Sequence, residues 1–279
     1  MTRIPRKLYH YCSVESFFQI ISSKSIWLSN YGQMNDAHES IWIEQYFDIV
    51  NNLFKSGKYK DFQNYTIPTY GWNKGNPHLF CLSEVGDSLG QWRAYADDGK
   101  GIAICFTPTI LNFQFDKPNR SSYIDHTLGL VKIEYNAKKQ KAKVEDLANL
   151  FKNIYDGKKD ELWEAASSFL GISLATESLV IKNPSFIEEK EWRIIHTPSD
   201  NYDLSEKNSH SISQMKFRTK DSNLTSYFEI DLSATFNSKL IPEIILGPKS
   251  GLDLSILKSF LEINNLEKTI VSKSASTYQ

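Results

Sequence analysis

The segment from Leu8 to Ser29 constrains the fold most tightly. Its first residues, Leu-Tyr-His-Tyr-Cys, favour a β-strand, and Ser13 is a good helix N-cap because its hydroxyl can accept from a free backbone N–H of the first turn. Ile26–Ser29 predicts a second strand. Between them, apolar residues recur with helical spacing at Val14, Phe17, Phe18 and Ile21. The order is strand, helix, strand, with His10 where a side chain can face a cleft.

Composition limits the classes to which the chain can belong. Of its 279 residues, 41% are hydrophobic and 23% charged, a balance that can bury a sizeable core. Lysine and arginine number 32 against 33 acids, so no net charge attracts nucleic acid or anionic lipid. Three cysteines without a C-x-x-C motif favour a reducing compartment. Since no run of 18 apolar residues and no apolar leader occurs, we expect a cytoplasmic protein without membrane contact.

The remaining pattern predicts one α+β domain over residues 1–279, with its core at about 8–272 and a split, mostly antiparallel sheet flanked by helices. Two segments are expected to be mobile loops: residues 56–77, rich in proline and glycine, and the polar residues 199–223. Strands are expected at 78–83, 102–106, 131–135, 191–196, 227–232, 241–246 and 269–272, and helices at 138–155, 161–178 and 255–263.

A second candidate for chemistry is the segment Glu188–Ile195, which contains three glutamates. On a strand, residues two apart share a face, so Glu189, Glu191 and Arg193 should project together. Trp192 and Ile194 should project the other way, into the core. Two neighbouring acids repel each other, and a cleft that binds a cation or a ribose would compensate for that repulsion. The alternatives are an edge strand with surface salt bridges and, for His10, a hydrogen-bonded structural histidine.

Several familiar sites are excluded by their spacing. Gly99-x-Gly101 lacks the third glycine of a dinucleotide loop, and a strand follows where a helix should. No G-x-S-x-G elbow occurs, and neither H-E-x-x-H nor a close set of histidines and cysteines suggests a metal. We therefore predict no metal site.

The order of short motifs resembles a bacterial domain-of-unknown-function family that also occurs in mobile and phage-defence gene neighbourhoods. The resemblance extends over roughly residues 8–272. Its motifs are Leu8-Tyr9-His10-Tyr11-x-Ser13, Trp27-Leu28-Ser29, Met34-Asn35-Asp36-x-x-Glu39, Phe80-Cys81-Leu82-Ser83, Trp92-x-x-Tyr95-Ala96 and Glu189-x-Glu191-x-Arg193.

The opening strand and capped helix also resemble the start of ADP-ribosyltransferases of the histidine–tyrosine–glutamate class. That resemblance implies an ADP-ribosyltransferase-like fold with NAD as substrate, in which His10 holds the nicotinamide ribose and Glu191 binds the ribose 2′-hydroxyl. Trp92 or Tyr95 would clamp the nicotinamide, although Trp92 could instead belong to the core. The pair Glu189-x-Glu191 is similar to the arginine-modifying class, which begins with Arg in place of His, so the acceptor stays open.

These resemblances imply the following site. The expected catalytic residues are Glu191, Glu189 and His10, and the expected NAD-contacting residues are His10, Tyr11, Ser13, Ser83, Trp92, Tyr95 and Arg193. A carboxylate at the 2′-hydroxyl would stabilise the oxocarbenium character that develops as the nicotinamide leaves.

The expected function is that of an ADP-ribosyltransferase or NAD glycohydrolase that acts on an unknown protein or nucleic-acid acceptor, in phage defence or as a toxin. Two alternatives stay open: a non-catalytic binding or sensor module, and an RNA- or nucleotide-processing enzyme on the same fold.

Overall fold

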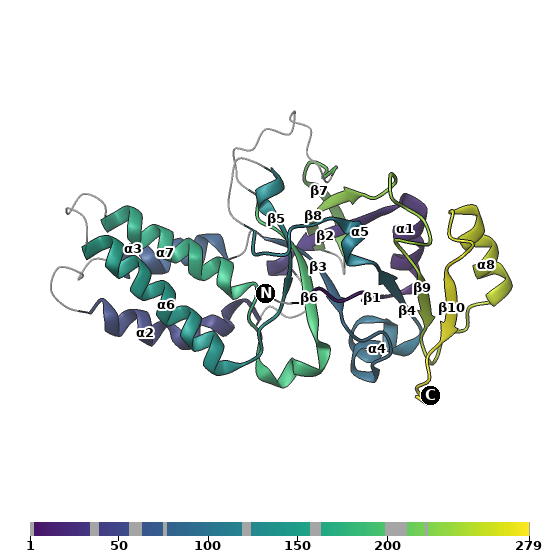
Figure 1. Ribbon diagram of the computed structural model, residues 1–279, viewed down its shortest axis with the longest axis horizontal. Helices are drawn as coiled ribbons and strands as arrows, with labels where there is room; N and C mark the ends of the chain where they lie inside the picture. Colours follow the sequence, from purple (N-terminus) through teal and green to yellow (C-terminus); the bar gives the residue numbers. More distant parts are fainter. Residues whose placement is uncertain are drawn as a thin grey trace.

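A central β-sheet carries a long helical arm on one side and a small strand–helix unit on the other (Figure 1). The computed structural model describes residues 3–33, 39–55, 63–74, 77–118, 124–156, 163–198, 211–220 and 223–278. Over these residues the protein is α+β, with a mixed, mostly antiparallel open sheet, as the sequence predicts.

The order of the main sheet is β10-β9-β4-β1-β3-β2-β8-β7, and β6 and β5 branch from β3. Only the β9–β10 pair is parallel among the described strand pairs. The strands are β1 (Leu8–Cys12), β2 (Ser25–Asn30), β3 (His78–Ser83), β4 (Ile102–Phe106), β5 (Leu128–Lys132), β6 (Glu191–His196), β7 (Lys216–Lys220), β8 (Asn223–Asp231), β9 (Glu243–Leu246) and β10 (Ile270–Lys273).

The branch at β3 leaves the two edges of this strand paired differently. β6 pairs with β3 from His78 to Ser83 and so occupies one whole edge of it. The other edge is shared, because β1 pairs with β3 only at Ser83 and β2 only at His78 and Leu79. Between these contacts β1 and β2 diverge, and the β3 segment 80–82 faces a gap in the sheet.

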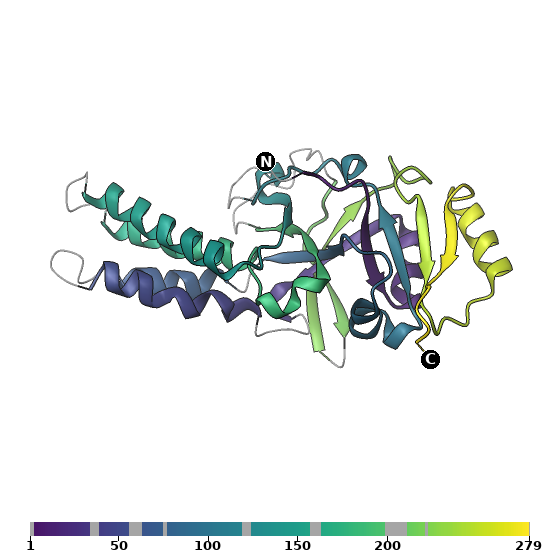
Figure 2. The ribbon, with the colours of Figure 1, turned by 60° about the horizontal axis from the view of Figure 1, so that its bottom comes forward.

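Helices cover both faces of the sheet (Figure 2). One core packs α1 and α8 against the sheet, a second fills the helical arm with α2, α3, α6 and α7, and a third, small cluster lies under α4. The helices are α1 (Val14–Ser23), α2 (Phe47–Leu53), α3 (Gln63–Asn73), α4 (Leu89–Tyr95), α5 (Pro108–Leu111), α6 (Ala137–Asp156), α7 (Trp163–Ser178) and α8 (Leu254–Ile263).

The opening segment forms the predicted strand, helix and strand, but the helix buries a face that is rotated from the predicted one. The Ser13 hydroxyl accepts from the Ser16 backbone N–H at 3.2 Å and caps α1. The buried face of α1 is formed by Phe17, Ile20 and Ile21, whereas Phe18, which the periodicity placed in the core, is 52% exposed. Phe18 instead stacks on a ring of α8, Phe260.

The segments expected to be loops contain regular structure. Residues 63–73 form α3 in spite of Pro68, since α3 packs closely along α7. A Cβ on Gly171 of α7 would lie 2.5 Å from the carbonyl oxygen of Thr66, so only glycine permits this approach. In the second segment, residues 216–220 form β7. Residues 56–62, 75–76, 199–210 and 221–222 lie outside the described residues, as do Met34, Asn35 and Asp36 of the predicted motif.

The other predicted elements lie close to their expected positions, and β3, β4 and β6 have the predicted bounds. The strand expected at 131–135 is β5, displaced toward the N-terminus to Leu128–Lys132. In the described ranges, none of the helices has the length and apolar character needed to cross a bilayer.

Candidate functional site

The gap between β1 and β2 opens into a cleft of about 1050 Å³. Side chains of both α1 and α4 line it. The two helices pack on opposite faces of the sheet, since the consecutive β1 residues Cys12 and Tyr11, which point to opposite faces, belong to the cores under α1 and α4 respectively. The cleft therefore extends across the gap, and the β3 segment 79–82 forms part of its wall.

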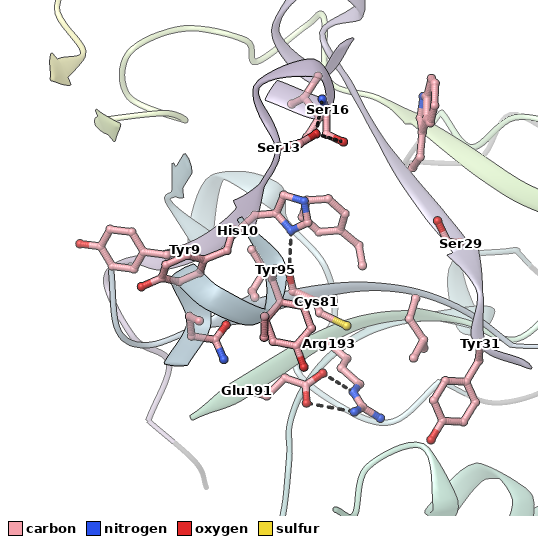
Figure 3. Close-up of a pocket in the computed structure, with 18 of the residues that line it drawn as sticks. Tyr9, His10, Ser13, Ser16, Ser29, Tyr31, Cys81, Tyr95, Glu191 and Arg193 are labelled. Carbon is pink, nitrogen blue, oxygen red and sulfur yellow. Dashed lines mark hydrogen bonds and ion pairs between the residues drawn. The ribbon is translucent and has the colours of Figure 1, made fainter. Parts of the chain in front are cut away.

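His10 projects from β1 into this gap (Figure 3). Its Nδ1 lies 2.8 Å from the carbonyl oxygen of Cys81, and its ring stacks on Phe80 with centroids 4.0 Å apart. Because a carbonyl only accepts, Nδ1 carries the proton and Nε2 keeps an acceptor lone pair. Burial lowers the pKa of His10 to about 4, so the ring is neutral near pH 7. The β3 backbone thus fixes both the tautomer and the orientation of the imidazole.

Glu191 opens β6 and is held in a buried ion pair. Its Oε1 accepts from Arg193 Nε at 2.6 Å and its Oε2 from Arg193 Nη2 at 3.0 Å. Lys182 Nζ lies 3.2 Å from Oε2. Burial alone would raise the pKa of Glu191, but the charges of Arg193 and Lys182 outweigh it and hold the pKa well below its usual range. Glu191 is therefore an ionised carboxylate in the wall of the cleft.

Glu189 reaches the same place by a different route from the one predicted. It ends a 3-10 turn, η7 (Pro184–Glu189), and Lys190 has a left-handed φ of 45°, so Glu189 is not on the strand. Lys182 Nζ lies 2.5 Å from Glu189 Oε2 and so binds both glutamates. The Tyr95 hydroxyl donates to Glu189 Oε1 at 3.0 Å. We call Lys182, Glu189, Glu191 and Arg193 the glutamate network.

The network explains how two neighbouring acids are tolerated. The side chains of Lys182 and Arg193 are each only 2% exposed, and both cations compensate the negative charges directly. The edge-strand alternative is wrong, because β6 pairs with β3 on one side and β5 on the other. As predicted, Glu191 and Arg193 share one face, while Trp192 and Ile194 enter the core on the other.

The far wall of the cleft is formed by β2, β8 and β7. Arg218 on β7 pairs in register with Thr225 on β8. Its Nη2 donates to Ser29 Oγ of β2 at 2.8 Å, and its guanidinium carbon lies 5.4 Å from the centroid of the Trp27 ring. All four side chains line the cleft. We call Trp27, Ser29 and Arg218 the Arg218 group.

Most of the predicted site residues come together in the cleft. In the view of Figure 3, Tyr95 lies between His10 and the Glu191–Arg193 pair, and Ser29 and Tyr31 lie on the side of β2. Those that line the cleft are His10, Tyr11, Ser13, Tyr95, Glu189, Glu191 and Arg193.

Two predicted residues, Trp92 and Ser83, do not line the cleft. Trp92 is fully buried, meets the Tyr11 ring edge-on with centroids 4.7 Å apart, and donates from Nε1 to Asp87 at 2.6 Å. It is a core residue, the alternative that the sequence left open. Ser83 is also buried and donates to the Glu189 carbonyl at 2.6 Å, so it holds the η7 turn in place. Both residues therefore contact residues that line the cleft without lining it themselves: Trp92 packs on Tyr11, and Ser83 binds the backbone of Glu189.

Sequence reasoning missed Lys182 and Arg218. Lys182 directly follows the apolar run Leu179–Ile181, where a lysine is unusual, and this was the one available signal. Arg218 lies in the polar segment that predicted a loop, so nothing there indicated burial. Among the residues that the structure describes, no three His, Cys, Asp or Glu side chains gather closely enough to hold a metal ion.

Comparison with known proteins identifies a matching family whose function is unknown. No curated protein and no solved structure matches the chain. Residues 91–194 match the family described as "Protein of unknown function (DUF2971)", over a shorter range than the expected 8–272. The matched range runs from α4 to β6 and contains Tyr95 and the whole glutamate network. The predicted resemblance to a domain-of-unknown-function family is confirmed for these residues.

Proposed function

We propose that the cleft binds NAD and that the protein cleaves the nicotinamide–ribose bond, as an ADP-ribosyltransferase or an NAD glycohydrolase. One observation carries the proposal: a histidine that is neutral near pH 7 and keeps an acceptor lone pair lines the same cleft as a glutamate that is ionised at that pH. A ribose needs hydrogen-bond acceptors for its hydroxyls, and an oxocarbenium-like transition state needs a nearby negative charge.

The residues then have distinct roles. His10 Nε2 accepts from a ribose hydroxyl, and Glu191 accepts from the 2′-hydroxyl while Arg193 keeps it ionised and oriented. The half-exposed Tyr95 ring packs on the nicotinamide, with its hydroxyl held by Glu189. The C1′–N bond breaks, and its electron pair leaves with neutral nicotinamide. A nucleophile bonds to C1′ and releases its proton to solvent.

The test is release of free nicotinamide from NAD by the purified protein, measured with and without cell lysate. A transferase releases nicotinamide faster when lysate supplies an acceptor, whereas a glycohydrolase needs only water. Glu191→Gln should lower the release at least about 100-fold, since removing one such electrostatic contact costs about 10²–10³ in rate.

The chain offers a matched control for this variant. Glu177 on α7 is also buried and ion-paired with two lysines, Lys117 and Lys143, but does not line the cleft. Glu177→Gln, like Glu191→Gln, removes a buried charge that is paired with two cations, so both variants should lose stability. Only Glu191→Gln should reduce nicotinamide release. Equal release by both variants, at a temperature where both are folded, would exclude Glu191 from the chemistry.

A second candidate is a non-catalytic binding or sensor module. It is favoured by the pairing of both Glu191 oxygens, an arrangement that also suits a purely structural ion pair. Under this function NAD or ADP-ribose still binds, but no nicotinamide appears with or without lysate. Binding measured by calorimetry beside the release assay separates the two functions.

A further inference from the structure

Arg218 is a half-buried cation without a counter-ion in the part of the chain that the structure describes. Its Nη2 donates to Ser29, an uncharged acceptor, and its Nε atom is buried with no hydrogen-bond partner. Glu229, an acid two residues beyond Tyr227 on β8, is engaged by Lys216, which lies two residues before Arg218. Leaving a charged donor unsatisfied in a wall of a cleft is costly, so the arrangement needs a reason.

The surroundings of Arg218 are those of a ligand site. The guanidinium packs over the Trp27 ring, which itself packs on Tyr227 with centroids 4.6 Å apart, so its plane is held in place. The hydroxyl-bearing Thr219 and Thr225 line the cleft beside it. An oriented guanidinium fork beside hydroxyl donors matches the geometry of a phosphate group.

The glutamate network differs from the Arg218 group in the charge that it can offer to a ligand. There, both cations are matched by carboxylates of the protein itself, so they offer little charge to an anionic ligand. At the Arg218 group, no carboxylate of the described residues matches the charge, which remains for a ligand. We propose that the Arg218 group is an anion subsite that binds a phosphate group of the ligand of the cleft.

This inference rests on the proposed function only in that the cleft binds a ligand, and it does not require cleavage of NAD. If the ligand is NAD, its pyrophosphate is the group bound. Inorganic pyrophosphate and ADP-ribose carry the same group, the first free and the second within a nucleotide. Titration of both with the full-length protein distinguishes the two sources.

The decisive variant is Arg218→Gln, measured by calorimetry with both probes. A charged hydrogen bond contributes enough that its loss should weaken binding about 10- to 100-fold. Arg93→Gln is the matched control: Arg93 is also an arginine over an aromatic ring, that of Tyr278 at 5.7 Å, but it does not line the cleft. Arg218→Lys retains the charge without the fork and should fall between Arg218→Gln and the wild type.

The outcomes are separable. Loss of affinity in Arg218→Gln but not in Arg93→Gln supports the subsite. It points to a free phosphate if both probes bind and to a nucleotide if ADP-ribose alone binds. Equal affinities in all proteins, equal losses in both variants, or no binding of either probe at millimolar concentration overturn it. Nicotinamide release with an unchanged KM for NAD in Arg218→Gln would overturn the subsite and leave the proposed function standing. Binding of the probes that depends on Arg218, without any release of nicotinamide, would overturn the proposed cleavage of NAD and leave the subsite standing.

Discussion

The two charged groups in the cleft solve the burial of charge in opposite ways. In the glutamate network, two acids and two cations neutralise one another at hydrogen-bond distance. In the Arg218 group, the cation contacts a serine hydroxyl and an aromatic face and, among the described residues, no carboxylate. A closed network is complete without a ligand, whereas an open one is completed by a ligand. The comparison indicates that the first network positions the acceptor oxygens of Glu191, whereas the Arg218 group supplies the unmatched charge of the cleft.

The largest expected difference between the two groups is in stability. Arg193→Leu leaves Glu191 buried without its main partner and should lower the free energy of unfolding by about 3–5 kcal/mol. Arg218→Leu removes a half-buried cation that has no counter-ion among the described residues, and should change the free energy of unfolding by less than about 1 kcal/mol, or increase it. Chemical denaturation of both variants measures the contrast. Equal destabilisation would mean that Arg218 belongs to a closed network as well.

The second prediction separates the support of the cleft from its surface. Trp92→Ala should lower the free energy of unfolding by about 3–5 kcal/mol, because it empties a fully buried site beneath Tyr11. Trp27→Ala removes a partly buried ring that lines the cleft, so its main effect should be weaker pyrophosphate binding. A denaturant melt and a pyrophosphate titration of each variant provide the check. The reverse result would place Trp92 in the ligand site.

The sequence predicted the framework of the cleft better than its charges. The β1–α1–β2 unit and β6 follow from local patterns, namely a capped amphipathic helix between β-type runs and the alternation of polar and apolar residues from Glu191 to Ile194. These patterns act over neighbouring residues. His10 and Glu191 were found because their strands were found.

Long-range pairing explains what the sequence did not predict. Lys182 bridges two glutamates only because the turn after α7 returns to β6, and the length of that turn carries no such information. The helix α3 contains Pro68 and glycines that favour a loop, and it forms because Gly171 on α7 lets the two helices approach closely. Arg218 is half-buried only because β7 pairs with β8 beside β2.

Acid should act on His10 before it acts on the glutamate network. The pKa of His10 is about 4 in the folded protein and about 6.5 in the unfolded chain. The unfolded chain therefore binds more protons between these values, and stability is lost as the pH falls from 6.5 to 4. The shift corresponds to at most about 3 kcal/mol. Glu191, whose pKa lies well below its usual range, stays ionised over this interval and contributes its loss at lower pH.

His10→Gln tests this order, since the variant removes the titrating group and keeps a polar side chain. Its unfolding free energy should depend less steeply on pH between 6.5 and 4 than that of the wild type. Some slope should remain, because burial also lowers the pKa of His196, to about 3. Denaturant titrations at half-unit pH intervals measure both slopes. Identical slopes would show that His10 takes up its proton without loss of the fold.

The smallest effect is expected from Lys216→Gln, which asks whether position or charge alone distinguishes Arg218. Lys216 lies two residues from Arg218 on β7, but its side chain is 46% exposed and ion-paired with Glu229. Such a surface pair contributes about 0–1 kcal/mol, and added salt reduces it further. The variant removes the same unit of charge as Arg218→Gln, but Lys216 does not line the cleft. At 150 mM salt the Debye length is about 8 Å, so an exposed charge outside the cleft is largely screened. The affinity for pyrophosphate should therefore change less than about two-fold. A loss as large as that in Arg218→Gln would mean that the net charge of β7, and not the oriented guanidinium over Trp27, attracts the anion.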